Sequence, residues 1–149
     1  MLNHKSVNKK IGLYFPIGSE VSTIDLIENL RKKKYIISLP VIDKNFEMSF
    51  YEWAKNNPLN INKFGIPEPL KSKKIIPSTL IIPLLALDIN LNRLGYGGGY
   101  YDRTISFLEK KSKILKFGVA FDEQEVKEVP TMRFDKKMDL ILTPTKIII

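Results

Sequence analysis

The sequence contains no cysteine among its 149 residues, which excludes disulfide bonds, thiolate zinc sites and cysteine nucleophiles. Its single histidine, His4, receives no functional role, and histidine-based triads and histidine metal clusters are excluded. The longest apolar run, 75–87, is too short to span a bilayer and contains Pro77 and Pro83. The first ten residues lack the apolar core of a signal peptide. Together these absences predict a cytoplasmic protein that does not enter a membrane.

The composition is that of a soluble globular protein, with 44% hydrophobic and 27% charged residues, and the length suits one domain. The net charge is +8, but the basic residues form scattered clusters at 31–34, 71–74, 110–113 and 136–137. A nucleic-acid-binding protein usually concentrates such residues along one face. We therefore expect a solvated basic surface that attracts small anions, with no nucleic-acid partner.

Hydrophobic periodicity predicts strands that alternate with helices. Ser22 or Thr23 can cap a helix whose apolar face carries Ile24, Ile27 and Leu30. We expect a second helix over about 100–111, a loop over 56–69, and strands at 11–15, 35–39, 46–51, 79–87, 116–120, 139–142 and 146–149. This order predicts an α/β fold, a single-domain three-layer sandwich around a mainly parallel, Rossmann-like sheet.

A glycine-rich loop lies between the strand expected at 79–87 and the second helix. It carries four glycines in five positions: Gly95, Gly97, Gly98 and Gly99 surround Tyr96. Such a loop at a strand–helix junction can direct several backbone N–H groups at an anion. Arg93 and Asp102 flank it and add a cation suited to phosphate and a carboxylate suited to a metal. The pattern favours a nucleotide site.

The loop departs from the two best-known glycine motifs. A P-loop ends in Gly-Lys-Ser/Thr, and the dinucleotide fingerprint would need a glycine at position 100, where Tyr100 stands. The structural alternative is a tight turn with Tyr100 and Tyr101 packed in the core. Because ligands of parallel sheets bind at the carboxyl ends of the strands, Glu20 and the glycine loop are expected on the same rim.

The run from Arg93 to Arg103 resembles the signature of the 5-formyltetrahydrofolate cyclo-ligase family. Further segments resemble that family in the same order, from about residue 11 to the C-terminus: 14–23, 39–41, 48–50, 64–69, 117–124, 129–130, 135–139 and 142–144. The resemblance implies ATP- and Mg²⁺-dependent cyclisation of 5-formyltetrahydrofolate, with polyglutamylated forms among the expected substrates, to 5,10-methenyltetrahydrofolate, with release of ADP and phosphate. It also implies a ligase of one-carbon metabolism, which we expect to be a monomer.

The resemblance assigns roles to individual residues. Arg93 and Tyr101 are the implied catalytic residues, and Asp102 with Asp135 would hold Mg²⁺. The folate pocket would contain Glu20, as acceptor for the pterin N–H donors, with Met48, Phe50, Phe64 and Tyr101 as walls. The ATP site would comprise Arg93, Leu94, Gly95, Tyr96, Gly97, Gly98, Gly99, Tyr100, Tyr101 and Asp102.

The N-terminus is the main departure from the family pattern. Family members usually begin with a helical segment that supplies a lysine to ATP, whereas this chain begins close to its first expected strand. We therefore expect one cyclo-ligase-like domain over 1–149 without that segment, for which Lys5, Lys9 or Lys10 could substitute. The alternatives are a shortened folate- or nucleotide-binding remnant with little activity, and a small basic nucleic-acid-binding protein.

Overall fold

The computed structural model describes residues 9–149, so the expectations for His4 and Lys5 fall outside the described residues. The helices are α1 (Ile24–Lys32) and α2 (Tyr100–Glu109), with a short 3-10 helix η1 (Asp122–Gln124). The strands are β1 (Lys10–Gly12), β2 (Ile36–Ile42), β3 (Met48–Glu52), β4 (Leu59–Ile61), β5 (Pro67–Pro69), β6 (Lys74–Ile75), β7 (Thr79–Pro83), β8 (Ala86–Leu87), β9 (Arg93–Leu94), β10 (Leu115–Val119), β11 (Leu140–Leu142) and β12 (Ile147–Ile148).

An eight-stranded sheet forms the middle of the molecule, in the order β12-β11-β10-β7-β1-β2-β3-β6. The five strands from β11 to β2 run parallel, whereas β12, β3 and β6 pair antiparallel with their neighbours. Two small antiparallel ribbons, β4–β5 and β8–β9, lie outside this sheet. The predicted α/β fold with a mainly parallel sheet is therefore confirmed.

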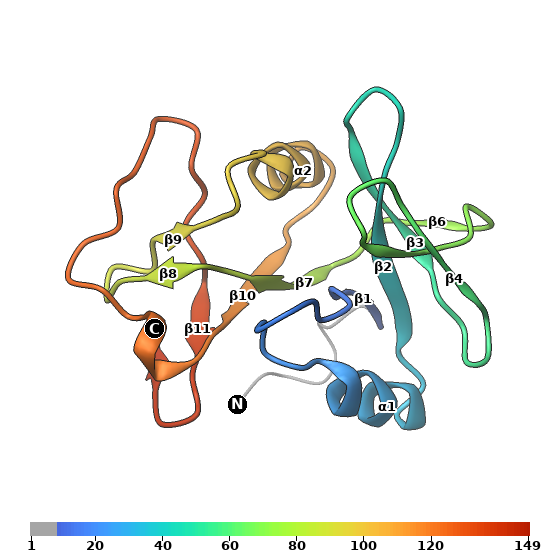
Figure 1. The fold of residues 1–149 in the computed structure, drawn as a ribbon, viewed down its shortest axis with the longest axis horizontal. Helices are drawn as coiled ribbons and strands as arrows, with labels where there is room; N and C mark the ends of the chain where they lie inside the picture. Colours follow the sequence, from blue (N-terminus) through green and yellow to red (C-terminus); the bar gives the residue numbers. More distant parts are fainter. Residues whose placement is uncertain (1–8) are drawn as a thin grey trace.

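The two helices cover opposite faces of the sheet (Figure 1). The crossover β1–α1–β2 moves one way along the sheet and β7–α2–β10 moves the other way, which places their helices on opposite sides. Side chains of β7 alternate between the two cores, as the period of two in a strand requires. Ile82 packs with Ile105 of α2, and Ile81 packs with Ile27 of α1. Each fully buried side chain of this size contributes roughly 1.5–3 kcal/mol.

Four strand predictions were wrong at their ends, and proline explains two of them. The strand expected at 11–15 is β1, which ends at Gly12. The strand expected to stop at Pro40 continues through it, because the pairing of β1 with β2 ends at Ser38 and leaves an open edge where proline is tolerated. The run 79–87 is broken after Pro83, and Leu85 donates its N–H to Leu94 in the β8–β9 ribbon instead. Phe46 is outside β3, in a hairpin turn with φ of 60°.

The segment 56–69, expected to be a loop, contains the β4–β5 ribbon. Asn62 organises its turn by accepting the N–H groups of Phe64 (2.8 Å) and Ile66 (3.0 Å) on Oδ1. Gly65 takes a left-handed φ of 77° there. The two prolines of β5 hid this strand from sequence analysis, since proline is unfavourable in a central strand but acceptable in a two-stranded ribbon. Within residues 9–149 no helix has the length and apolarity needed to cross a membrane.

A fully buried carboxylate, Asp88, fixes the β8–β9 turn, and the sequence analysis did not single it out. It accepts the N–H groups of Asn90 (2.9 Å) and Asn92 (3.2 Å), the Asn92 side-chain amide (3.1 Å) and the N–H of Val129 (3.0 Å). Burial favours its neutral form, but these hydrogen bonds outweigh burial and lower the pKa of Asp88 below 3.8. Asp88 therefore ties the ribbon below the glycine loop to the segment around Val129.

Asp88→Asn is expected to lower the free energy of unfolding by about 2–3 kcal/mol at pH 7. The NH₂ group of asparagine would face N–H donors and leave some of them without an acceptor. The folded-state pKa is depressed, so this contribution is complete above the unfolded value of 3.8 and is lost as pH falls through the folded value. Urea unfolding from pH 7 to pH 3 measures it. Asp43→Asn is the matched control, because the Asp43 carboxylate also accepts two turn N–H groups but is not fully buried. Equal stability of wild type and Asp88→Asn at pH 7 would contradict this account.

Candidate active site at the carboxyl ends of β1 and β7

The neighbouring parallel strands β1 and β7 form the topological switch point of the sheet. The chain leaves β1 towards β2 on one side and leaves β7 towards β10 on the other. At such a point the two connections separate and leave a crevice outside the carboxyl ends of the strands, where ligands of open α/β sheets bind. The crevice of this protein is bordered by the segment after β1, which contains Glu20, and by the segments that follow β7 and β10.

The segment after β1 is held in a compact loop by Tyr14. Its hydroxyl donates to the Val21 carbonyl (2.6 Å), and its own carbonyl accepts the Thr23 hydroxyl (2.7 Å). Thr23 thus stands at the N-cap of α1, as predicted, but its side chain bonds Tyr14 instead of capping the helix. Glu20 accepts the Ile17 N–H (3.0 Å) and lines the crevice. The predicted position of Glu20 beside the glycine loop is confirmed by this arrangement.

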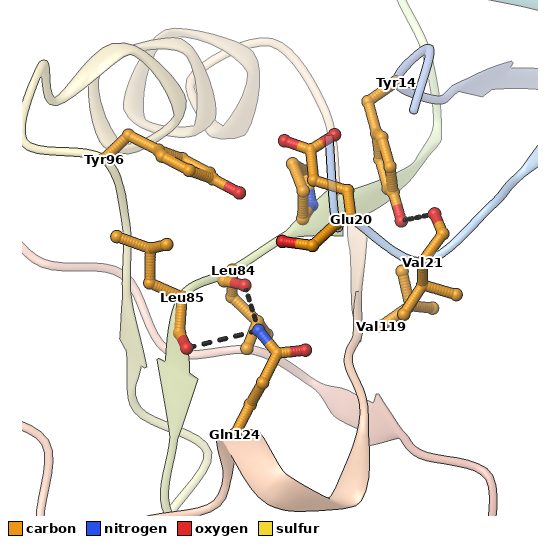
Figure 2. Close-up of a pocket in the computed structure, with 10 residues that line it drawn as sticks. Tyr14, Glu20, Val21, Leu84, Leu85, Tyr96, Val119 and Gln124 are labelled. Atoms are coloured by element: carbon orange, nitrogen blue, oxygen red, sulfur yellow. Dashed lines mark hydrogen bonds between the residues drawn. The ribbon is translucent and has the colours of Figure 1, made fainter. Parts of the chain in front are cut away.

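Tyr96 reaches from the glycine loop across the crevice towards Glu20, as Figure 2 shows. Burial and the nearby Glu20 carboxylate raise the pKa of Tyr96 to about 12, so its hydroxyl is protonated at neutral pH. The cavity that remains between these side chains measures about 40 Å³. Pockets for small-molecule ligands measure roughly 300–1,000 Å³. The space between Tyr96 and Glu20 is therefore smaller than a pocket that holds a whole small-molecule ligand.

Gln124, to which the sequence analysis gave no role, forms another wall of the crevice (Figure 2). Its side-chain oxygen accepts the Phe121 N–H (2.7 Å), and its Nε2 donates to the carbonyls of Leu84 (2.7 Å) and Leu85 (3.2 Å). Gln124 therefore fixes the end of β7 to the turn that follows β10. These carbonyls lie 40 and 39 residues earlier in the chain, so no local sequence pattern indicates the contacts.

The glycine loop ends at the N-terminus of α2 and presents unpaired backbone donors. Gly97 (φ 93°) and Gly99 (φ 67°) are left-handed, and Gly99 is the N-cap. Among residues 9–149, none of the six N–H groups from Gly97 to Asp102 has a protein acceptor. Free N–H donors at a helix N-terminus are the geometry that suits an anion, and anion binding by this loop stays a prediction.

Arg93 lies in β9 with 9% of its surface exposed, beneath this loop. Its NH2 group contacts Asp102 Oδ1 at 3.4 Å, and its Cζ lies 5.5 Å from the centre of the Tyr101 ring. A Cβ at Gly95 would stand 2.8 Å from its NH1 group, so a larger residue at that position would displace the guanidinium. The Nε of Arg93 is buried without a partner in the described part of the protein. Arg93 therefore retains a hydrogen-bonding capacity that a ligand could satisfy.

Asp102 and Asp135 lie on segments that meet at the start of α2. Asp102 Oδ1 accepts the N–H of Lys136 (3.0 Å), the residue after Asp135, while Asp135 Oδ2 accepts the Met132 N–H (2.7 Å). No group of three or more acidic or histidine residues that could hold a metal occurs within 9–149. Mg²⁺ commonly uses one or two carboxylates together with substrate phosphates and water. The structure thus brings the segments that carry Asp102 and Asp135 together, and a Mg²⁺ site there stays a prediction.

The predicted walls of the folate pocket do not all gather at the crevice. Phe50 is a core residue with 2% of its surface exposed, and Met48 packs against the same core. Phe64 is exposed in the β4–β5 turn, and Tyr101 packs against the core at the start of α2. Of these predicted residues only Glu20 lines the crevice, where Tyr96 faces it.

A carboxylate and a residue of a glycine-rich loop at the switch-point crevice of an α/β sheet are typical of the ligand-binding enzymes with this fold. The model of the 5-formyltetrahydrofolate cyclo-ligase family matches residues 2–144, and this chain belongs to that family. The resemblance noted in the sequence is thereby confirmed, together with the class of enzyme it implied.

Similar proteins agree with this assignment. The chain is 37% identical over 135 residues to the 5-formyltetrahydrofolate cyclo-ligase of Haemophilus influenzae, covering 85% of this chain and 71% of that protein. It is 35% identical to a probable 5-formyltetrahydrofolate cyclo-ligase of Schizosaccharomyces pombe, covering 94% and 77%. The solved structure of Aquifex aeolicus 5,10-methenyltetrahydrofolate synthetase matches with a TM-score of 0.76 at 33% identity, covering 93% of this chain and 70% of that one.

Proposed function

We propose that this protein uses ATP to convert 5-formyltetrahydrofolate into 5,10-methenyltetrahydrofolate, ADP and phosphate. The observation that carries the proposal is the meeting of Glu20 with the glycine loop at one crevice, in a chain that belongs to the cyclo-ligase family. Two substrates must meet for this reaction, and the crevice has the Glu20 carboxylate on one side and Tyr96 of the glycine loop on the other. ATP and the folate are the small-molecule partners in this proposal.

The proposed chemistry begins at the formyl oxygen, which is a poor leaving group. Transfer of the γ-phosphoryl group of ATP to that oxygen releases ADP and allows N10 to close the ring. The C–O bond then breaks and phosphate departs. Such a transfer depends on positioning and charge neutralisation more than on a covalent catalyst. Arg93 and the N–H groups of the glycine loop, including those of Tyr100 and Tyr101, suit these tasks because they present cationic and dipolar donors together.

The remaining residues receive roles consistent with their positions. Glu20 accepts the N–H donors of the pterin, and Tyr101 lies near the reacting group beside Arg93. Asp102 and Asp135 would hold Mg²⁺, which when bound neutralises charge on the phosphates of ATP. In this proposal the pterin displaces Tyr96 from Glu20, because the cavity of about 40 Å³ between them is smaller than a ligand pocket. Met48, Phe50 and Phe64 contribute only if binding rearranges the elements that carry them.

The protein acts in this proposal as a monomeric, single-domain cytoplasmic enzyme. A net charge of +8 would favour polyglutamylated folates, whose tails add negative charge. The scattered basic clusters leave nucleic acid as the less favoured partner. Among the alternatives, an inactive binding remnant would need no pair of carboxylates beside the glycine loop, whereas this chain has Asp102 there, in contact with the residue that follows Asp135.

The test is an absorbance assay for 5,10-methenyltetrahydrofolate with purified protein, 5-formyltetrahydrofolate, ATP and Mg²⁺. Product formation should require ATP, and one ADP should appear for each product formed. Omission of ATP, and its replacement by a non-hydrolysable analogue, are the controls. Binding of both substrates without product formation would identify an inactive remnant. Binding of neither substrate would contradict the proposed function.

A further inference from the structure

Arg103 connects the glycine loop to a distant hairpin. It lies in α2, four residues after the N-cap Gly99, and its side chain is exposed. Its NH1 group donates to the Gly98 carbonyl at 2.8 Å, and its NH2 group donates to the Phe46 carbonyl at 3.4 Å. Its guanidinium also lies over the ring of Tyr100, with Cζ 5.0 Å from the ring centre. One side chain thus joins the loop, the helix and the β2–β3 turn.

The bond to Gly98 fixes a peptide plane of the glycine loop. In a trans peptide the C=O and the following N–H point in opposite directions. Because Arg103 holds the Gly98 carbonyl, the N–H of Gly99 must point away from the guanidinium. That N–H belongs to the row of donors without protein acceptors among residues 9–149. Arg103 therefore sets the direction of a donor that it does not itself touch.

The glycine loop needs a restraint from outside because its own residues do little to fix the backbone conformation. Glycine loses more conformational freedom on ordering than other residues, and Gly97 and Gly99 occupy left-handed conformations. No side chain caps the N-terminus of α2. Tyr100 packs closely on Gly98, where a Cβ would stand 2.5 Å from the Tyr100 ring. Arg103 holds this arrangement in place, because it stacks on the Tyr100 ring and donates a hydrogen bond to the Gly98 carbonyl.

We propose that Arg103 is a positioning residue that orients the N–H groups of the glycine loop for the phosphates of ATP. The inference rests on the proposed function, in which this loop binds ATP. Arg103 is not a phosphate ligand in this proposal, since its NH1 and NH2 groups are directed to two backbone carbonyls. Lysine should replace it poorly, because an ammonium cannot span both carbonyls or stack as a planar group.

The test compares Arg103→Ala and Arg103→Lys with Arg133→Ala, a matched control at another exposed arginine that lies over an aromatic ring, 5.7 Å from the centre of Phe134. Calorimetry measures ATP affinity, steady-state assays measure kcat and the KM for folate, and nitrogen-15 NMR of the ligand-free proteins reports the glycine-loop amides. We expect ATP affinity to fall about tenfold in Arg103→Ala and about threefold in Arg103→Lys. The folate KM should change less than about twofold, and the control should match wild type.

The ligand-free spectra separate positioning from direct contact. Shifted amide signals of Gly98 and Gly99 in Arg103→Ala, combined with weaker ATP binding, support the proposal. Unchanged ATP affinity overturns it, and so does weaker ATP binding with unchanged glycine signals, which would make Arg103 a phosphate ligand. If Arg103→Ala does not fold, the same criteria apply to Arg103→Lys. Wild-type protein that binds no ATP would contradict the proposed function itself, while the ligand-free spectra would still show whether Arg103 orders the loop.

Discussion

Arg93→Ala is expected to lower kcat/KM for ATP by roughly 30- to 1,000-fold, equivalent to about 2–4 kcal/mol of transition-state stabilisation. Arg93 is the buried cation beside the glycine loop, and its Nε has no protein partner within residues 9–149. Charge that develops on the phosphates during transfer would be stabilised by a fixed guanidinium in this weakly solvated place. Steady-state kinetics and calorimetry with ATP and with folate measure the effect.

The loss should appear in both ATP binding and turnover, whereas folate affinity should change little. Arg93→Lys tests the geometry, because it preserves the charge but not the planar group next to Tyr101 and Asp102. Arg133→Ala controls for the removal of a positive charge elsewhere. Near-normal ATP affinity and rate in Arg93→Ala would assign Arg93 a purely structural role as the partner of Asp102. Thermal unfolding of each variant distinguishes that outcome from a general loss of fold.

The elements that positioned the site were predictable from the sequence because their signals are local. The apolar run that contains β7, the periodicity of α1 and the glycine loop before α2 each follow from residues close together in the chain. The loop signal was strong because four glycines lie within five positions and are flanked by an arginine and an aspartate. Family resemblance added Glu20, whose neighbours alone do not distinguish it from a solvated loop residue.

The features that were missed depend on contacts between distant segments. Asp88 is buried because Val129, 41 residues later, donates to it, and Gln124 bonds carbonyls 39 and 40 residues earlier. No local pattern encodes such partners. The closure of the crevice by Tyr96 likewise depends on the fold that brings the loop to Glu20. Phe50 illustrates the opposite error, since an aromatic residue at an alternating strand position suits a pocket wall and a core equally well.

Asp102→Asn is expected to lower turnover with Mg·ATP by about 100-fold and to raise the Mg²⁺ concentration needed for half-maximal rate. The change removes the negative charge but keeps a carbonyl oxygen of the same size, which can still accept the Lys136 N–H that Asp102 Oδ1 accepts at 3.0 Å. The fold at the start of α2 should therefore persist. Folate binding should be nearly unchanged, because Asp102 does not line the Glu20 crevice.

The decisive measurement is metal affinity, read separately from activity. Mn²⁺ binding in the presence of ADP, followed by electron paramagnetic resonance, should weaken in Asp102→Asn and in Asp135→Asn. It should not weaken in Glu109→Gln. Glu109 is also a carboxylate of α2, but it pairs with Lys116 and Lys136. If Asp102→Asn binds Mn²⁺ like wild type yet loses activity, its carboxylate serves to orient Arg93, to which it lies 3.4 Å away, and the metal is held by the nucleotide and Asp135. A shared loss in both aspartate variants would instead place the metal between α2 and the segment that carries Asp135, because only that position lets the two carboxylates act on one ion.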